Sequence, residues 1–259
     1  MDDSSGALAS EIEYHERLYS GFAQLHFAKA AVRALRAHMV ERIVRMTGVP
    51  ATARALSIGC GIGDTELLLA PLISELVGVD ASPSAIRQAR ADAAKAGRSH
   101  LHYIEGTLEA QELKPASFDL IIAIFFLHHL PDDVLQTMPG RMMQLLKPGG
   151  CFYALDPSRY RLSGAIGSLL FPKLMRKYQS PGERQLRPRD TADLFTQAGF
   201  ECRLEYYDFA SSPLAGLFPA WALGYRAARS VDNWIVRMPL LRRMGSNFEI
   251  IARKPLRQS

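Results

Sequence analysis

The chain has 259 residues, of which 48% are hydrophobic and 22% charged. This composition is typical of one substantial folded domain and excludes a largely disordered chain. The longest unbroken apolar run, Leu120 to Leu127, is too short to span a membrane, and the acidic start MDDSS lacks the basic and apolar parts of a secretory signal. We therefore expect a soluble, cytoplasmic protein. The three cysteines are odd in number and far apart, which predicts neither a disulfide framework nor a metal site.

The first fifty residues are predicted to be mainly helical. Apolar residues recur at helical spacing between positions 11 and 46, with an interruption near Ser20 and Gly21, and the run Gly48-Val49-Pro50 ends the pattern. Some polar and aromatic side chains of this segment are candidates for ligand contact, with buried packing as the alternative: Tyr14, His15 and Tyr19.

Strands and helices are predicted to alternate between residues 51 and 157 and beyond. The short apolar runs are Ala55–Ile58, Leu76–Val79, Leu101–Ile104, Leu120–Ile124 and Phe152–Leu155. The helical segments are Asp64–Leu72, Ser84–Ala96, Asp132–Leu146 and Asp190–Ala198. This alternation favours a parallel sheet that is covered on both faces, an α/β fold.

The alternation breaks after residue 157. The last part, residues 158–259, contains two more strand-like runs, Glu201–Tyr207 and Phe248–Ala252, and two insertions at about 158–189 and 213–245. The insertions carry net charges of +7 and +4, which leaves −6 for the rest of the chain, and both contain apolar stretches. They are candidates for a lid. Their charge indicates either solvated basic faces or an anionic partner, such as a membrane surface, a phosphorylated substrate or an acidic carrier protein; nucleic acid is disfavoured because no nucleic-acid motif is present.

The strongest motif is a glycine loop between a buried strand and a helix. Gly59, Gly61 and Gly63 form G-x-G-x-G, and Asp64 stands where a dinucleotide-binding loop needs its third glycine. A carboxylate there would repel a pyrophosphate but not a cofactor without phosphate. Asp64 or Thr65 is expected to cap the helix that follows. A purely structural turn is the alternative interpretation.

The second motif is a strand that ends in an acid, Asp80, 21 residues after Gly59. A carboxylate at this position can accept hydrogen bonds from both hydroxyls of a ribose. The alternative is that Asp80 only opens a turn before Ser82, which would cap the next helix. Together with the glycine loop, we favour the ribose.

With these two motifs, the chain resembles the class I S-adenosylmethionine-dependent methyltransferases, in particular the ubiquinone/menaquinone-biosynthesis-like group of type 11 methyltransferases. The resemblance covers residues from about 54 to 157 and consists of LSIGCGIG, VGVDASPSAIRQAR, YIEGTLE, SFDLIIAIFFLHHLPD and LLKPGGCFYALDP, in that order. It implies a Rossmann-like, doubly wound sheet of seven strands, mostly parallel with the last strand antiparallel. Residues 1–50 would then be an N-terminal helical lid, residues 51–157 the cofactor-binding core, and residues 158–259 the rest of the sheet with the lid insertions, all in one compact domain.

The resemblance also implies S-adenosyl-L-methionine as cofactor and assigns residues to it. The three glycines would pass under its methionine and ribose parts, Asp80 would hold the ribose, and Ala81, Ser82, Thr107 and Leu108 would surround the adenine, with Ala123 and Ile124 behind the sulfonium. The complete set of expected cofactor-binding residues is Ser57, Gly59, Cys60, Gly61, Gly63, Asp80, Ala81, Thr107, Leu108 and Ala123.

Two of these positions depart from the family pattern. Position 57 is usually acidic and is Ser57 here, and position 107 is usually Asp and is Thr107 here. Both replacements keep hydrogen-bonding ability but lose a charge. A third position, His128, follows the fourth strand on the ligand side of such a sheet. It is the candidate general base, with local packing of both His128 and His129 as the alternative.

The predicted function is methyl transfer from S-adenosylmethionine to a small hydrophobic or lipid-like acceptor, reached at or near a membrane surface to which the protein would attach peripherally. A soluble metabolite or natural product as acceptor is the first alternative. A nicotinamide-dependent oxidoreductase and a non-catalytic subunit that keeps the methyltransferase fold are the other two. The apolar and aromatic residues of the insertions favour the hydrophobic acceptor; those singled out are Phe171, Leu217, Phe218 and Trp221.

Overall fold

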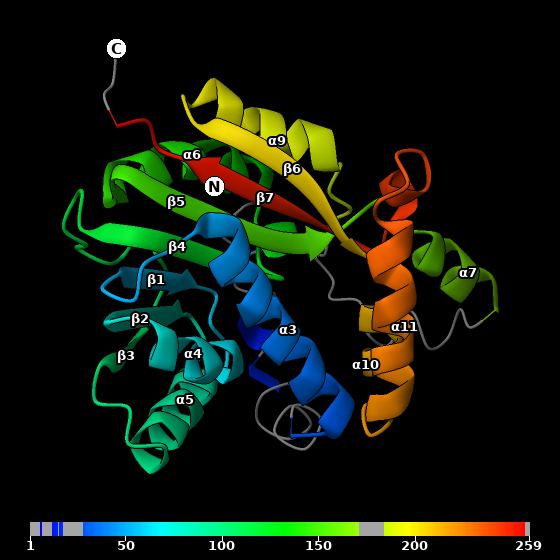
Figure 1. Ribbon diagram of the computed structural model, residues 1–259. Helices are drawn as coiled ribbons and strands as arrows, with labels where there is room; N and C mark the ends of the chain where they lie inside the picture. Colours follow the sequence, from blue (N-terminus) through cyan, green and yellow to red (C-terminus); the bar gives the residue numbers. More distant parts are fainter. Residues whose placement is uncertain (1–5, 7–11, 15, 18–27, 171–183, 257–259) are drawn as a thin grey trace.

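The computed structural model describes residues 6, 12–14, 16–17, 28–170 and 184–256. Their centre is a sheet of seven strands in the order β3-β2-β1-β4-β5-β7-β6 (Figure 1). The strands β1 to β5 pair in parallel, whereas β7 is antiparallel to both of its neighbours, β5 and β6. The predicted mostly parallel sheet with an antiparallel last strand is therefore confirmed. The strands are β1 (Arg54–Ile58), β2 (Glu75–Asp80), β3 (Leu101–Glu105), β4 (Phe118–Ile124), β5 (Leu146–Pro157), β6 (Glu201–Asp208) and β7 (Asn247–Arg253).

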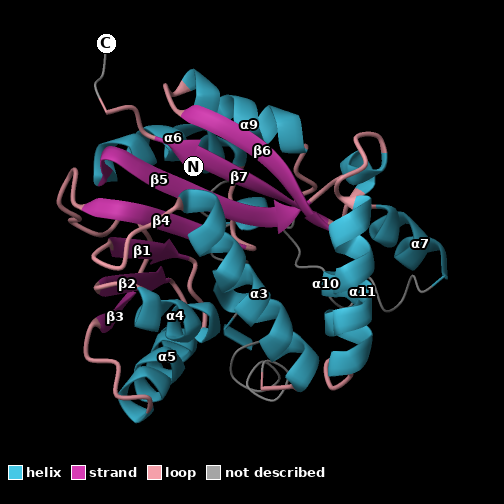
Figure 2. Cartoon of the chain, in the orientation of Figure 1, coloured by secondary structure: helices cyan, strands magenta, loops and turns pink. Residues whose placement is uncertain are grey.

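Helices cover both faces of the sheet (Figure 2). One face packs against α3 (Ala30–Thr47), α4 (Asp64–Leu69), the 3₁₀ turn η1 (Ala70–Leu72) and α5 (Pro83–Lys95), and the other against α6 (Asp132–Leu145) and α9 (Pro188–Gln197). Neighbouring residues of one strand point to opposite cores: in β4, Leu120 joins the α3 side and Ile121 the α6 side. This explains why the parallel strands are continuous apolar runs rather than alternating ones.

The remaining elements lie after β5 and β6. They are η2 (Leu127–His129), α7 (Leu162–Leu170), α10 (Ser211–Leu217), α11 (Ala222–Ile235) and η3 (Leu241–Met244). The chain between α10 and α11 reaches the start of α3, where the Ala31 amide donates to the Pro219 carbonyl at 2.8 Å. None of the helices in the described ranges is both long and apolar enough to cross a membrane. His15, Tyr19 and Phe171, which were singled out above, lie outside the described residues.

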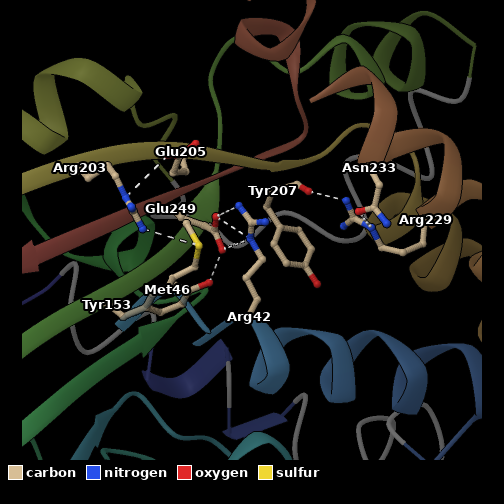
Figure 3. Close-up of polar contacts among 9 residues, drawn as sticks. All are labelled: Arg42, Met46, Tyr153, Arg203, Glu205, Tyr207, Arg229, Asn233 and Glu249. Atoms are coloured by element: carbon tan, nitrogen blue, oxygen red, sulfur yellow. Dashed lines mark hydrogen bonds and ion pairs between the residues drawn. The ribbon is translucent and has the colours of Figure 1, made fainter. Parts of the chain in front are cut away.

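A buried set of polar contacts fastens α3 and α11 to the sheet (Figure 3). The guanidinium of Arg42, on α3, forms a two-pronged ion pair with Glu249 on β7, and the Tyr153 hydroxyl donates to the same carboxylate. Arg229, on α11, donates to the Tyr207 carbonyl of β6 at 2.7 Å. The Arg42 charge is thus paired with a buried carboxylate, whereas the Arg229 guanidinium is held by neutral acceptors, the Tyr207 carbonyl and Asn233 Oδ1.

Candidate active site

The glycine loop after β1 has the backbone geometry that only glycine adopts easily. Gly59, Gly61 and Gly63 have φ angles of 66°, 53° and 75°. Space is also short: a Cβ atom on Gly59 would lie 2.2 Å from the Phe126 ring, and one on Gly63 would lie 2.1 Å from the Tyr103 hydroxyl. The N-cap of α4 is Gly63, which offers no side chain, so the expectation of a cap at Asp64 or Thr65 was wrong.

Asp80, at the end of β2, holds this loop in place. Its Oδ2 accepts the Gly61 amide at 2.7 Å, and its Oδ1 accepts the Ser82 amide at 2.9 Å. Ser82 is the N-cap of α5 and accepts the Ala85 amide at 3.2 Å. The turn-forming role is therefore present. Asp80 also faces the cavity described next, so this role does not exclude contact with a ligand.

A cavity lies at the carboxyl ends of the central strands, the usual ligand position in a doubly wound sheet. Five predicted cofactor residues line it: Gly59, Asp80, Ala81, Thr107 and Leu108. The described lining also includes residues that sequence reasoning did not place in the site: Ile12, Ile58, Val79, Gly106, Glu109, Phe125, Phe126, His129, Leu130, Val134 and Met138. Ser82, expected beside the adenine, completes the set.

The charges of the cavity limit the ligand that it can hold. Its described lining contains two acids, Asp80 and Glu109, and neither lysine nor arginine. The start of α4 carries two further acids, Asp64 and Glu66. These carboxylates would repel a pyrophosphate, whereas they would not repel a cation or a neutral, phosphate-free group.

The aromatic wall of the cavity follows directly after β4. Phe125 has a φ angle of 54°, which is rare for a bulky residue. Its amide donates to the Leu155 carbonyl at 2.7 Å, so the sheet itself holds the unfavourable backbone angle. Strained residues of this kind concentrate at functional sites. Faces of Phe125 and Phe126 can attract a positively charged ligand.

His128 and His129 occupy different places in the structure. The His128 imidazole is buried, its Nδ1 lies 2.7 Å from Asp156 Oδ1, and its amide donates to the same oxygen at 3.2 Å. Burial raises the pKa of Asp156 to about 8. His128 is not among the described residues that line the cavity, whereas His129, whose ring centre lies 3.9 Å from that of His128, is.

Comparison with known proteins identifies the fold and its family. Residues 55–150 match the methyltransferase domain family. The uncharacterized methyltransferase sll0829 of Synechocystis is 30% identical over 153 residues, which cover 57% of this chain and 66% of that protein. The ubiquinone biosynthesis O-methyltransferase of Xylella fastidiosa is 26% identical over 196 residues, covering 73% and 77%. The structure of a SAM dependent methyltransferase from Archaeoglobus fulgidus matches with a TM-score of 0.59 at 16% identity, covering 86% and 94%.

The chain belongs to the class I S-adenosylmethionine-dependent methyltransferases. Its matches to three curated relatives span 66%, 40% and 52% of their own length. The cofactor of this family suits the cavity. S-adenosylmethionine has ribose hydroxyls that can donate to a carboxylate, a cationic sulfonium that aromatic rings can attract, and no phosphate. The residues present therefore fit the cofactor of the methyltransferase family.

Five expected cofactor residues are not among the described residues that line the cavity. These are Ser57, Cys60, Gly61, Gly63 and Ala123. Ser57, at the usually acidic position of the methyltransferase family, donates to Glu66 Oε1 at 2.6 Å. The α4 residue Glu66 therefore brings a carboxylate next to Ser57, the β1 position at which the family usually has an acid. Glu66 is 2% exposed, and burial raises its pKa to about 7, opposed by the Ser57 hydrogen bond. Its acidic side chain is visible in the sequence, but its inward direction follows from packing alone.

A part of the N-terminal segment closes one side of the methyltransferase cavity. Ile12 contributes to the lining. Four residues later, Glu16 accepts the Ser82 hydroxyl at 2.5 Å and the Ser84 amide at 3.2 Å, at the N-terminus of α5. A carboxylate at a helix N-terminus is favourable. This contact holds Glu16 beside the cofactor end of the sheet, and the lid role of residues 1–50 stays a prediction.

Proposed function

We propose that this protein binds S-adenosylmethionine in the cavity at the ends of β1, β2 and β4 and transfers its methyl group to a small, largely apolar acceptor. The observation that carries the proposal is the cavity itself, which combines the Asp80 carboxylate, an aromatic wall and an absence of cations among its described residues. When bound, the cofactor supplies an electrophilic methyl group on a positively charged sulfur, and the sulfur leaves as a neutral thioether.

The chain's own residues position the reactants. Asp80 is already fixed by two backbone amides, so it can accept ribose hydroxyls without reorganisation. Phe125 and Phe126 line the cavity, where their rings can exclude water and attract the cationic end of the cofactor. The Arg36 guanidinium covers one face of the Phe125 ring, 5.8 Å from its centre. A proton released by a hydroxyl or amine acceptor can pass to the imidazole of His129, which faces the cavity.

Two features support an apolar acceptor. The cavity wall on the side of α6 consists of Leu130, Val134 and Met138. The helices α10 and α11, which follow β6, carry half-exposed Leu217, Phe218 and Trp221. One relative bears the name ubiquinone biosynthesis O-methyltransferase, which agrees with a largely apolar acceptor. A soluble, polar metabolite is the competing acceptor.

Calorimetry tests the cofactor. S-adenosylmethionine and S-adenosylhomocysteine should bind, and NAD should not. Asp80→Ala should weaken binding about 10- to 100-fold, the worth of hydrogen bonds to a charged group. Glu105→Ala is the matched control, because Glu105 pairs with Asp80 in the sheet but is exposed and absent from the cavity lining. Binding of NAD instead would indicate an oxidoreductase, and binding of neither a non-catalytic subunit.

Alkylated phenols and amines of increasing chain length test the acceptor. Each methylene that the site buries should raise kcat/KM about fourfold, from about 0.8 kcal/mol of transfer free energy, until the pocket is full. Methyl transfer is measured by mass spectrometry of the acceptor. Equal turnover of the unsubstituted and alkylated compounds would favour the soluble polar acceptor instead.

A further inference from the structure

The helix α11 has an apolar face that no described part of the chain covers. Its buried face carries Gly224, Tyr225 and Arg229 and packs toward β6 and α3. On the opposite side, Leu223 and Trp234 are 74% and 62% exposed. A surface helix normally buries its apolar residues and exposes polar ones, so this exposed apolar face needs an explanation.

The exposed residues follow helical spacing. Leu223, Ala227, Val231 and Trp234 are separated by four, four and three residues, so they form one stripe. Trp221, directly before the helix, adds a further exposed aromatic side chain at 55% exposure, and its ring packs on Gly224 of the buried face. Figure 1 shows this helix past the end of β6, with α7 drawn farther out in the same view.

The stripe continues past the end of α11 into a short, exposed turn. Leu240 is 80% exposed, and Leu241 and Met244 of η3 are also exposed. We call the exposed side chains between Leu217 and Met244 the α11 surface. A leucine as accessible as Leu240 gains nothing from the folded chain itself, and it is suited to insertion into an apolar phase.

Arginines flank the apolar stripe, and exposed acids are missing. Arg226 is exposed on α11, Arg237 is exposed just after the end of this helix, and Arg242 and Arg243 are exposed on η3. Between residues 209 and 248 the chain has a single acid, Asp232. Asp232 is fully buried and accepts the amides of Ala210 and Ser211, so it does not offset the surface charge.

We propose that the α11 surface docks on a lipid bilayer that contains anionic headgroups. The arginines meet the headgroup phosphates, and Trp221, Trp234 and Leu240 enter the interface between headgroups and acyl chains. This is the arrangement of an amphipathic helix that lies in the membrane plane, with long cationic side chains reaching the polar layer.

The charges argue against a second copy of this chain as the occupant. A symmetric dimer would bring the same surface of both copies together and place four arginines opposite four arginines, with no exposed acid of the α11 surface to separate them. An acidic protein would satisfy the arginines. A bilayer also accommodates the exposed leucines and tryptophans over the whole length of α11 and η3. The inference does not depend on the proposed reaction.

Intrinsic fluorescence gives a direct test, because the chain has two tryptophans and both, Trp221 and Trp234, belong to the α11 surface. Vesicles of phosphatidylcholine with a rising fraction of phosphatidylglycerol should shift the emission to the blue and carry the protein upward in flotation. Binding should fall as salt rises, since screening shortens the reach of exposed charges. Lipids brominated near the headgroup should quench the emission.

Variants locate the contact. Changing Arg237, Arg242 and Arg243 together to Gln should weaken binding about 100-fold, or about fivefold for each arginine near an anionic surface. The charge-matched control changes Arg45, Arg141 and Arg203 to Gln, on α3, α6 and β6, and should lower binding far less. Leu240→Ser should weaken binding, whereas Leu256→Ser, at a similarly exposed leucine near the end of β7, should not. Circular dichroism and S-adenosylmethionine calorimetry report whether each variant is folded.

Several outcomes would overturn the inference. Emission that does not change with any vesicle, or equal loss of binding in the two arginine triples, would remove the α11 surface from membrane contact. Saturation by polyglutamate together with no vesicle binding would assign the surface to an acidic protein. Because the cofactor site is measured separately, a protein that binds S-adenosylmethionine but no vesicle would leave the proposed function intact.

Discussion

A single buried carboxylate, Glu66, lies beside the glycine loop and is half titrated near neutral pH. Its pKa is raised from 4.5 to about 7, mainly by burial, and one of its oxygens has no hydrogen-bond partner within the described structure. An acid with a raised pKa holds its proton in the folded state after the unfolded chain has released it. Its contribution therefore stabilises the fold at low pH and is lost as pH rises from about 4.5 through 7.

Glu66→Gln should remove this pH dependence. The variant keeps an acceptor for the Ser57 hydroxyl but cannot ionise. Relative to the wild type, its free energy of unfolding should rise with pH between about 4.5 and 7 and level off on the order of 3 kcal/mol higher. The measurement is urea unfolding of both cofactor-free proteins across this range. Asp156, whose pKa is also raised, contributes equally to both and cancels in the difference. A flat difference curve would contradict the assignment.

The two adjacent histidines can be separated by substitution. Sequence reasoning selected His128 as the base, but its Nδ1 is engaged with buried Asp156, and His129 faces the cavity. We expect His129→Ala to lower kcat about 10²-fold with little change in cofactor binding. His128→Asn, whose amide can donate to Asp156 in place of Nδ1, should retain most of the activity, as a positioning residue would. Loss of kcat in His128→Asn as large as in His128→Ala would instead support His128 as the base.

The residues of the site were predictable to the extent that backbone chemistry fixes them. Gly59 and Asp80 stand at set distances in a strand-loop-helix unit, and both line the cavity. Met138 and Leu130 were not foreseen, because which face of α6 turns toward the ligand depends on how the helix packs on the sheet. The adjacent pair Phe125-Phe126 at a strand end carried a usable signal, since both residues stand at the ligand edge of the sheet, where they pack against the two cores and also line the cavity.

At the scale of elements, one buried ion pair adds to the apolar packing that attaches α3 to the sheet. Glu249 is fully buried, and the Arg42 side chain is 13% exposed. Removing one partner leaves the other charge buried and unpaired, which typically costs 3–5 kcal/mol. Arg42→Met should therefore destabilise the protein by about this amount in urea unfolding.

Two further variants control this prediction. Arg42→Met combined with Glu249→Gln should recover much of the loss, since no uncompensated charge remains. Arg45→Ala, an exposed arginine on the next turn of the same helix, should change stability by about 0.5 kcal/mol or less. If Arg42→Met is as mild as Arg45→Ala, the ion pair does not hold the helix.

The elements themselves were largely predictable, and the differences have local causes. All seven strands occur where apolar runs predicted them. The predicted helix Asp64–Leu72 changes to a 3₁₀ turn at Ala70 because Pro71 interrupts the helical hydrogen bonds. The apolar segment after residue 213 divides into α10 and α11 around Pro219 for a similar reason. The strand β5 begins at Leu146 rather than Phe152, since its pairing with β4 passes through an irregularity next to Phe118.

At the scale of the whole molecule, charge is separated along the chain rather than balanced. The net charge of +5 hides two insertions with +7 and +4 and a remainder with −6. The described cavity has acids and no cations, whereas the α11 surface has cations and no exposed acid. A cationic cofactor and an anionic surface are thus attracted to different parts of one molecule, and each approach is oriented by the field of the whole protein.

The packing of Tyr103 against two glycines restricts how this protein can change over evolutionary time. Its hydroxyl donates to the Gly63 carbonyl at 3.3 Å, and its ring also covers Gly78 on β2, where an added Cβ would come within 2.7 Å. A larger residue at position 78 is tolerable only after position 103 has become smaller, and a smaller residue at 103 first leaves a void. Each single step is thus deleterious, and the double change relieves only the clash with Tyr103, because an added Cβ at position 78 would also lie 2.9 Å from Cys60 Sγ. Among homologues, positions 78 and 103 should therefore vary together.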